Sequence, residues 1–172
     1  TEPMLITADR QTAGRGRQGK SFYSPAGTGI YMSLVLHPNA DLQNAVTATT
    51  AASVAVCKAI ERLTDIKPKI KWVNDVYVNG QKICGILTEA VSDFESGTVT
   101  SVIIGIGINI STSDFPSDIE NAGCLNSDVN RNELAAAVAD ELLELSLGNY
   151  DDFIDYYISR SMIIGCKINL GT

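Results

Sequence analysis

Apolar runs separated by polar turns predict a chain of short strands and three longer helices. Residues 42–63 lack Gly and Pro and repeat apolar side chains at helical spacing, so we expect a helix with one apolar stripe. A second helix is expected between Asn130, its cap, and Gly148, its stop, and a third over residues 151–160. Strands are expected at 4–8, 29–37, 69–78, 81–89, 99–110 and 164–170.

The strands that follow the first helix are predicted to form an antiparallel meander. Asn79-Gly80 separates the runs at 69–78 and 81–89, and both residues tolerate the positive φ of a two-residue hairpin turn. A polar turn at 92–98 then leads to the strand at 99–110. The expected fold is α+β, a mixed and largely antiparallel sheet with helices packed on one face, and the length indicates one domain.

The strand at 99–110 has two unlike faces. One face is apolar and consists of Ile104, Ile106, Ile108 and Ile110, and the other consists of Gly105, Gly107 and Asn109. Glycines at every second position weaken a strand and indicate that a ligand or another part of the chain comes close, and Gly85 adds to them from the preceding strand. The glycine face is therefore either the floor of a site for a flat ligand or a surface for a closely packed helix.

The strand predicted at 69–78 also alternates. Its apolar face is expected to hold Ile70, Trp72, Val76 and Val78. Its other face is expected to hold Lys69, Lys71, Val73, Asp75 and Tyr77. The charges in the second set indicate a face that meets water or lines a polar site.

A polar loop at residues 9–28, the basic loop, contains the least ordinary stretch of the chain. Four of the 13 basic residues lie at positions 10–20 without an acid, and the other nine face 20 acidic residues elsewhere. Three glycines in this stretch let backbone N–H groups approach a ligand. A small anion such as a phosphate fits these features better than a long polyanion, because the net charge is −7. A nucleic-acid-binding module that uses this loop stays an alternative.

Two phosphate-binding templates match the basic loop by spelling. Gly14 to Ser21 reads as a Walker A P-loop, and Gly14-x-Gly16-x-x-Gly19 reads as a dinucleotide fingerprint. Both require a helix that starts at the last glycine. Residues 22–29 contain a proline and two glycines, which disfavour a helix. Neither template is favoured, although a P-loop nucleotide hydrolase stays an alternative.

Composition excludes several other classes. No run of 18 apolar residues predicts a membrane span. The four cysteines are widely spaced and predict neither a zinc site nor a disulfide framework, but reduced thiols of a cytoplasmic protein. The one histidine, His37, lies at a strand end, so a Ser/His/Asp triad is not available. Catalysis, if present, is expected to use positioning and electrostatic stabilisation.

Five stretches, in order, resemble the biotin–protein ligases over roughly the first 110 residues. They are Gln11 to Lys20, Phe22 to Pro25, Lys71 to Asp75, Lys82 to Glu89 and Gly105 to Asn109. The family usually has Pro where this chain has Val73, a change that suits a strand. The resemblance implies a class II synthetase-like catalytic domain at 1–162, without its N-terminal biotin-contacting segment, and the start of a small C-terminal β domain at 163–172.

The resemblance also implies the activity of a biotin–[acetyl-CoA-carboxylase] ligase. Biotin would react with ATP to give biotinyl-5′-AMP, and the biotinyl group would pass to a lysine of a biotin carboxyl carrier protein or carrier domain. ATP with Mg²⁺ is the expected co-substrate, biotin the substrate, and no bound prosthetic group is expected. No membrane or nucleic-acid partner is expected through this chain, and an open sheet allows a homodimer. A lipoate- or octanoate–protein ligase is the nearest alternative, although the arginine–glycine loop favours biotin.

Carried over by position, the resemblance assigns roles to individual residues. Lys71 and Arg17 would be catalytic and would stabilise charge in both half-reactions. The biotin site would comprise Gln11, Arg15, Gly16, Arg17, Lys71, Gly85, Gly105 and Gly107. The nucleotide site would comprise Arg15, Arg17, Phe22 and Asn109, and no residue is assigned to a metal held by the protein alone.

Overall fold

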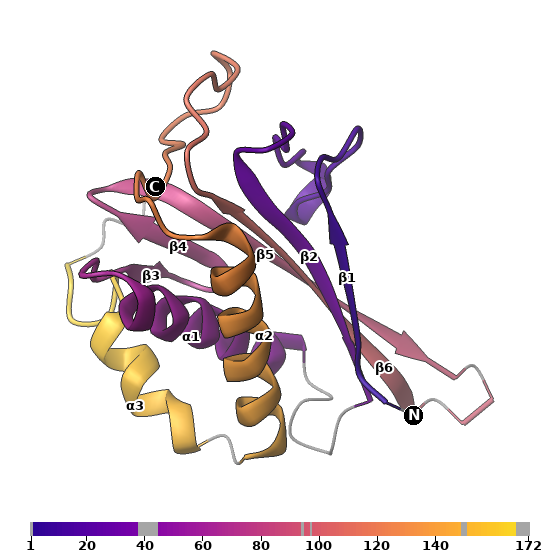
Figure 1. The fold of residues 1–172 in the computed structure, drawn as a ribbon. Helices are drawn as coiled ribbons and strands as arrows, with labels where there is room; N and C mark the ends of the chain where they lie inside the picture. Colours follow the sequence, from indigo (N-terminus) through magenta and orange to yellow (C-terminus); the bar gives the residue numbers. More distant parts are fainter. Residues whose placement is uncertain (1, 38–44, 94, 97, 149–150, 168–172) are drawn as a thin grey trace, which may run out of the picture.

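The computed structural model describes residues 2–37, 45–93, 95–96, 98–148 and 151–167, and its centre is one six-stranded sheet (Figure 1). The order across the sheet is β1-β2-β6-β5-β4-β3, and every neighbouring pair is antiparallel. The strands are β1 (Met4–Ala8), β2 (Gly29–Leu36), β3 (Lys69–Lys71), β4 (Asp75–Val78), β5 (Gln81–Ser92) and β6 (Val99–Asn109). The predicted α+β class is confirmed.

Three helices cover one face of this sheet (Figure 1). They are α1 (Ala45–Leu63), α2 (Arg131–Leu147) and α3 (Asp151–Arg160). Helix α1 packs on β5, β4 and β6, α2 packs on α1 and β2, and α3 packs on α1 and β3. Asn130 caps α2 as predicted, because its side chain accepts hydrogen bonds from the backbone N–H groups of Asn132 and Glu133.

The apolar face of β6 forms the centre of the core. Ile104 and Ile108 are fully buried, and Ile106 and Ile110 are nearly so. These side chains meet the alanine- and valine-rich stripe of α1, in which Ala51, Val54 and Ala55 are inaccessible to solvent. The alternation of β6 therefore leaves its glycines on the opposite face of the sheet.

The meander is confirmed, with small changes at its ends. Asn79 and Gly80 form the turn between β4 and β5 with φ values of 50° and 79°. Strand β5 continues to Ser92, beyond the predicted end at residue 89, and pairs with β6 from Cys84 to Ser92. Strands β5 and β6 therefore extend several residues beyond Gly85, Gly105 and Gly107, toward the turn that joins them.

The single strand predicted at 69–78 is wrong, because residues 72–74 form a turn between β3 and β4. The two strands pair with each other, so Lys71 lies opposite Asp75. Trp72 is 57% exposed, although Ile70, expected on the same face, is fully buried. Val73, expected on the polar face, is buried instead, and the hydroxyl of Ser53 in α1 approaches its carbonyl oxygen at 3.3 Å. The turn reverses the chain, so alternation does not continue across it.

The strand predicted at 164–170 is also not observed over its described part. Residues 164–167 form turns, and residues 168–170 lie outside the described residues, as do residues 42–44 of the predicted first helix. Met162 donates a backbone hydrogen bond to the carbonyl of Ile70 at 2.8 Å, which covers the β3 edge of the sheet. No helix within the described ranges is long and apolar enough to cross a membrane.

Candidate functional site

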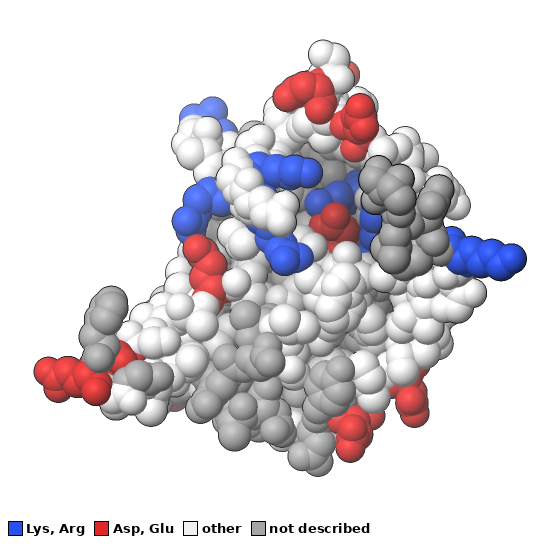
Figure 2. All heavy atoms as spheres, turned by 180° about the vertical axis from the view of Figure 1, so that it is seen from behind, with Lys and Arg blue, Asp and Glu red and all other residues white. Residues whose placement is uncertain are grey.

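The face of the sheet away from the helices is hollowed by a cavity of about 970 Å³, which we call the open-face cavity. Figure 2 shows this face: Lys and Arg side chains gather around a hollow, with acidic side chains among and above them. Every residue to which the sequence assigned a site role lines this cavity, namely Gln11, Arg15, Gly16, Arg17, Phe22, Lys71, Gly85, Gly105, Gly107 and Asn109. The fold thus brings together residues from the basic loop and from β3, β5 and β6.

The basic loop folds back on itself as a narrow hairpin. Backbone N–H groups of Gln11, Gly16 and Phe22 donate to the carbonyls of Ser24, Lys20 and Gly14 at 3.1, 2.7 and 2.9 Å. A short 3₁₀ turn at Arg17–Gly19 forms the tip, and Gly19 has a φ of 74°. No α-helix follows, since Lys20 is extended and Ser21 bridges to Arg15. The loop and the antiparallel sheet exclude both the P-loop and the dinucleotide templates.

Both arginines of the tip contact the sheet. Arg15 Nη2 forms an ion pair with Glu89 Oε2 of β5 at 2.9 Å. Arg17 Nη1 donates to Asn74 Oδ1 at 3.1 Å, and Asn74 Nδ2 donates in turn to the carbonyl of Ile86 at 3.1 Å. The guanidinium groups therefore lie over the sheet, where they can donate in a fork to a phosphate or carboxylate.

The glycine floor is partly covered by the basic loop itself. A Cβ added at Gly107 would overlap the ring of Phe22, and one added at Gly85 would lie 3.1 Å from it. The same ring makes an edge contact with Tyr31, at a centroid distance of 6.5 Å. A Cβ at Gly105, in contrast, would meet only ordinary contacts of 3.4 Å or more. Packing against Phe22 accounts for Gly85 and Gly107, whereas the space above Gly105 is open to a ligand.

Two lysines bring further positive charge to the cavity. Lys71 Nζ lies 5.5 Å from the ring centroid of Tyr77, a cation–π contact that leaves the ammonium free to turn toward a ligand. Lys82, which the sequence analysis did not assign, lies 2.7 Å from Asp75 Oδ1. The two-residue hairpin at Asn79-Gly80 places Lys82 opposite Tyr77. The register of this hairpin could therefore have predicted that Lys82 belongs to the site.

A segment between β6 and α2, residues 110–130, forms one wall of the cavity and is called the roof segment. Phe115 and residues 118–122 of this segment line the cavity. The ring of Phe115 contacts Tyr23 of the basic loop edge-on, at a centroid distance of 6.2 Å. At its start, Asn109 is buried and donates from Nδ2 to the carbonyl of Gly123 at 3.0 Å. Among the described residues, no partner is found for the Oδ1 atom of Asn109, which makes it a candidate acceptor for a ligand N–H group.

Among the described residues that line the cavity there is no cysteine and no histidine. Cys57 and Cys84 are buried in the core, where burial raises the pKa of both thiols, so they are inert. Burial likewise raises the pKa of Tyr31, whose hydroxyl donates to the carbonyl of Pro25 at 2.8 Å. His37 does not line the cavity, and its Nδ1 lies 3.0 Å from the carbonyl of Thr100. Within the described ranges, no three His, Cys, Asp or Glu side chains come together to hold a metal ion.

These features define a site for anionic ligands in which the cationic side chains of Arg15, Arg17, Lys71 and Lys82 surround a glycine floor. Comparison with known proteins identifies a family of protein ligases named for biotin and lipoate. Residues 1–109 match the sequence model of the Biotin/lipoate A/B protein ligase family. The match covers more than half of the 172 residues, and the chain therefore belongs to this family.

Individual relatives agree with this assignment. The "Bifunctional ligase/repressor BirA" of Bacillus spizizenii is 40% identical over 158 residues, which are 90% of this chain and 48% of that protein. The "Biotin--[acetyl-CoA-carboxylase] ligase" of Mycobacterium tuberculosis is 29% identical over 97% of this chain and 64% of its own length. This chain spans about half or less of the length of the BirA proteins of Bacillus spizizenii and Bacillus subtilis.

Solved structures show the same fold. The biotin protein ligase from Aquifex aeolicus in complex with biotin and ATP superimposes with a TM-score of 0.78 and 28% identity. The superposition covers 97% of this chain and 73% of that one. The sheet and helices described above are therefore those of a biotin protein ligase catalytic domain.

Proposed function

We propose that this chain activates biotin with ATP as biotinyl-5′-AMP and transfers the biotinyl group to a lysine of a carrier protein. The proposal rests on one observation: Arg15, Arg17, Lys71 and Lys82 converge on one cavity, above a glycine floor. The names of its relatives support biotin rather than lipoate or octanoate as the substrate. The P-loop hydrolase alternative is not proposed, because no helix starts at Gly19.

In the first half-reaction, a biotin carboxylate oxygen attacks the α-phosphorus of ATP. A new O–P bond forms, the bond from the α-phosphorus to the bridging oxygen breaks, and pyrophosphate leaves with the electron pair. Both reactants are anions, so their approach is opposed by repulsion that nearby cations reduce. We assign this role to Lys71 and Arg17, with Lys82 as a further cation on the same side of the floor.

In the second half-reaction, the uncharged ε-amine of a carrier lysine attacks the acyl carbonyl. A C–N bond forms, the C–O bond to the phosphate breaks, AMP leaves, and the nitrogen releases a proton to solvent. The same cations would stabilise AMP as it departs. A basic loop that lies over the cavity would also protect the water-labile acyl-adenylate.

We also propose positions for the two ligands, which the open floor at Gly105 and the lining of the cavity support. We place biotin over the open floor at Gly105, near Gln11, Arg15 and Gly16. We place the nucleotide near Phe22, Arg17 and the unpartnered Oδ1 of Asn109. Mg²⁺ would enter on the triphosphate and neutralise part of its charge. Asp118 and Glu120 of the roof segment line the cavity and fit a cation held partly by phosphates.

The remaining assignments are broader. We assign residues 1–162 to the catalytic domain, and the division at residue 163 stays a prediction. We propose a cytoplasmic protein whose partner is a biotin carboxyl carrier protein or carrier domain of a carboxylase.

Strand β1 is an edge strand whose five residues are all exposed, and pairing of two such edges would give the expected homodimer. Light scattering coupled to gel filtration, with and without biotin and ATP, would test it.

The experiment that tests the function is direct detection of the acyl-adenylate. The full-length protein would be incubated with Mg²⁺-ATP and, separately, biotin, lipoate or octanoate, and the products identified by mass. Biotinyl-AMP should form with biotin and not with the other acids. Adenylates of the fatty acids alone, or ADP released without any acid, would contradict the proposal.

A further inference from the structure

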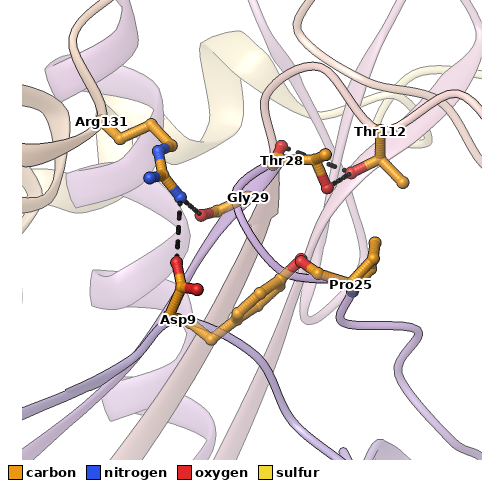
Figure 3. A network of polar contacts seen from close by, with 7 residues as sticks. Asp9, Pro25, Thr28, Gly29, Thr112 and Arg131 are labelled. Carbon is orange, nitrogen blue, oxygen red and sulfur yellow. Dashed lines mark hydrogen bonds and ion pairs between the residues drawn. The ribbon is translucent and has the colours of Figure 1, made fainter.

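The basic loop and the roof segment have their bases in the same place, although about 100 residues separate them in sequence. The basic loop begins after β1 and ends at β2, and the roof segment begins after β6 and ends at α2. Figure 3 shows residues from all four of these ends side by side, with Arg131 of α2 beside Asp9 and Gly29. Both segments line the open-face cavity, so contacts at their bases affect the position of the cavity walls around any ligand.

One set of contacts joins the end of the basic loop to the start of the roof segment. The carbonyl of Thr28 accepts hydrogen bonds from the backbone N–H groups of Ile110 and Ser111, both at 3.0 Å. The hydroxyls of Thr28 and Thr112 lie 3.0 Å apart. Thr112 is only 2% exposed, so this hydroxyl contact is shielded from competing water.

A second contact joins the other ends. Arg131 Nη1 donates to the carbonyl of Gly29 at 3.2 Å and lies 3.7 Å from Asp9 Oδ1 (Figure 3). There is no room for a side chain at Gly29, because a Cβ at this position would lie 2.7 Å from the Tyr31 hydroxyl and 2.8 Å from the carbonyl of Ile108. Arg131 therefore contacts both ends of the basic loop: Asp9, its first residue, and Gly29, which follows its last.

The place of Arg131 in its own helix supports a role outside that helix. It is the first residue of α2, where the helix dipole disfavours a cation. Asn130 already caps the free N–H groups, so the helix start does not need the arginine. The hydrogen bond to Gly29, in contrast, has an ionised donor and is the stronger kind.

We propose that Arg131 and Thr112 are positioning residues that tie the bases of the basic loop and the roof segment together, so that the two segments close over the cavity as one unit. In this arrangement the fixed bases of the two segments keep the ring of Tyr23, from the basic loop, in contact with the ring of Phe115, from the roof segment. Neither residue lines the cavity. Ordering of one segment by a ligand would thereby order the other.

Two proteases report separately on the two segments. The roof segment contains no Lys or Arg, so trypsin cuts the basic loop at Arg10, Arg15, Arg17 or Lys20 and leaves the roof segment intact. Glu120 is the one glutamate of the roof segment and the basic loop has none, so a glutamate-specific protease reports on the roof. Trypsin sites in α1, such as Lys58, report global unfolding in the same sample.

The variants are Thr112→Val and Arg131→Gln in the full-length protein, with Arg131→Lys as the conservative change. Arg62→Gln is the matched control, because Arg62 forms a comparable ion pair with Glu141, at 3.2 Å, between α1 and α2. The measured quantity is the rate of trypsin cleavage in the basic loop divided by the rate at Lys58 of α1, a site that none of these variants removes. We expect this ratio to rise at least threefold in Thr112→Val and Arg131→Gln, to rise less in Arg131→Lys, and to stay unchanged in Arg62→Gln. A ratio equal to wild type in both Thr112→Val and Arg131→Gln would overturn the proposal.

A ligand experiment extends the test and rests on the proposed function. Biotin alone, at saturation, should protect both the basic loop and Glu120 in the wild-type protein. In Arg131→Gln, biotin should protect the basic loop and leave Glu120 as sensitive as in the free protein. Equal protection of Glu120 in wild type and Arg131→Gln would count against the tie. Absence of any protection in wild type would count against biotin as the ligand, whereas the ligand-free cleavage ratio still decides on the tie.

Discussion

The two faces of strand β6 show how one sequence pattern serves two purposes. On the covered face, Ile104, Ile106 and Ile108 are buried against α1 and supply the core. On the open face, Gly105 and Gly107 supply a floor beneath Phe22 and the cavity. Neighbouring residues thus differ in what they affect: the isoleucines should set stability and the glycines should set ligand binding.

The largest expected effect is on stability. Ile104→Ala should lower the free energy of unfolding by about 2–5 kcal/mol, because it removes buried carbons and leaves a cavity. Ile103→Ala is the matched control on the open face, where the side chain is only partly buried, and its loss should be smaller. Denaturant titrations of both variants measure the difference, and equal losses would show that the open face also contributes to the core.

The largest expected effect on chemistry is at the cations of the open face. Lys71→Ala and Arg17→Ala should each slow biotinyl-AMP formation more than tenfold, which is about 1.4 kcal/mol or more of transition-state stabilisation. Lys69→Ala is the matched control, because Lys69 is on the same short strand but does not line the cavity. Pyrophosphate release measures the rate. A near-normal rate in Lys71→Ala or Arg17→Ala would remove the role assigned to that residue.

The two floor glycines should respond differently to an added methyl group. Gly105→Ala should leave the thermal midpoint unchanged but weaken biotin binding, by about 1–3 kcal/mol if the methyl group meets the ligand. Gly107→Ala should displace the ring of Phe22 and open the basic loop even without ligand, because the new Cβ overlaps that ring. Calorimetric titration with biotin and trypsin cleavage of the free protein distinguish the two. Unchanged biotin affinity in Gly105→Ala would place the ligand elsewhere in the cavity.

The smallest expected effect is at the surface of the basic loop. The Arg15–Glu89 pair is exposed, with side-chain accessibilities of 72% and 43%, so it should stabilise the closed loop by only about 0.2–1 kcal/mol. Glu89→Gln should therefore raise trypsin cleavage of the loop by a few-fold at most. The increase should disappear in about 1 M salt, where the Debye length is only about 3 Å and the attraction between the two exposed charges is screened. An increase that persists at high salt would mean that Glu89 holds the loop by packing or hydrogen bonding rather than by charge.

Some of this site was predictable from local pattern. The hairpin at Asn79-Gly80, the isoleucine and glycine faces of β6 and the cap at Asn130 all depend on neighbouring residues, and all are observed. The turn at 72–74 was not predictable in this way. The stretch Lys71 to Asp75 alternates well enough to read as a strand, and only its packing, with Val73 against α1 and Trp72 against Tyr157, shows the reversal.

The antiparallel α+β class, the two faces of the central strands and the residue types of the site could be predicted from the sequence, because each of these follows from short-range periodicity, turn chemistry and charge. Three contacts depend on the tertiary structure: Phe22 covers part of the glycine floor, Asn74 joins the site through Arg17, and Arg131 reaches the base of the basic loop. These contacts join residues from 57 to 102 positions apart. Their geometry depends on how the strands are ordered in the sheet and how loops close over it, which no local pattern specifies.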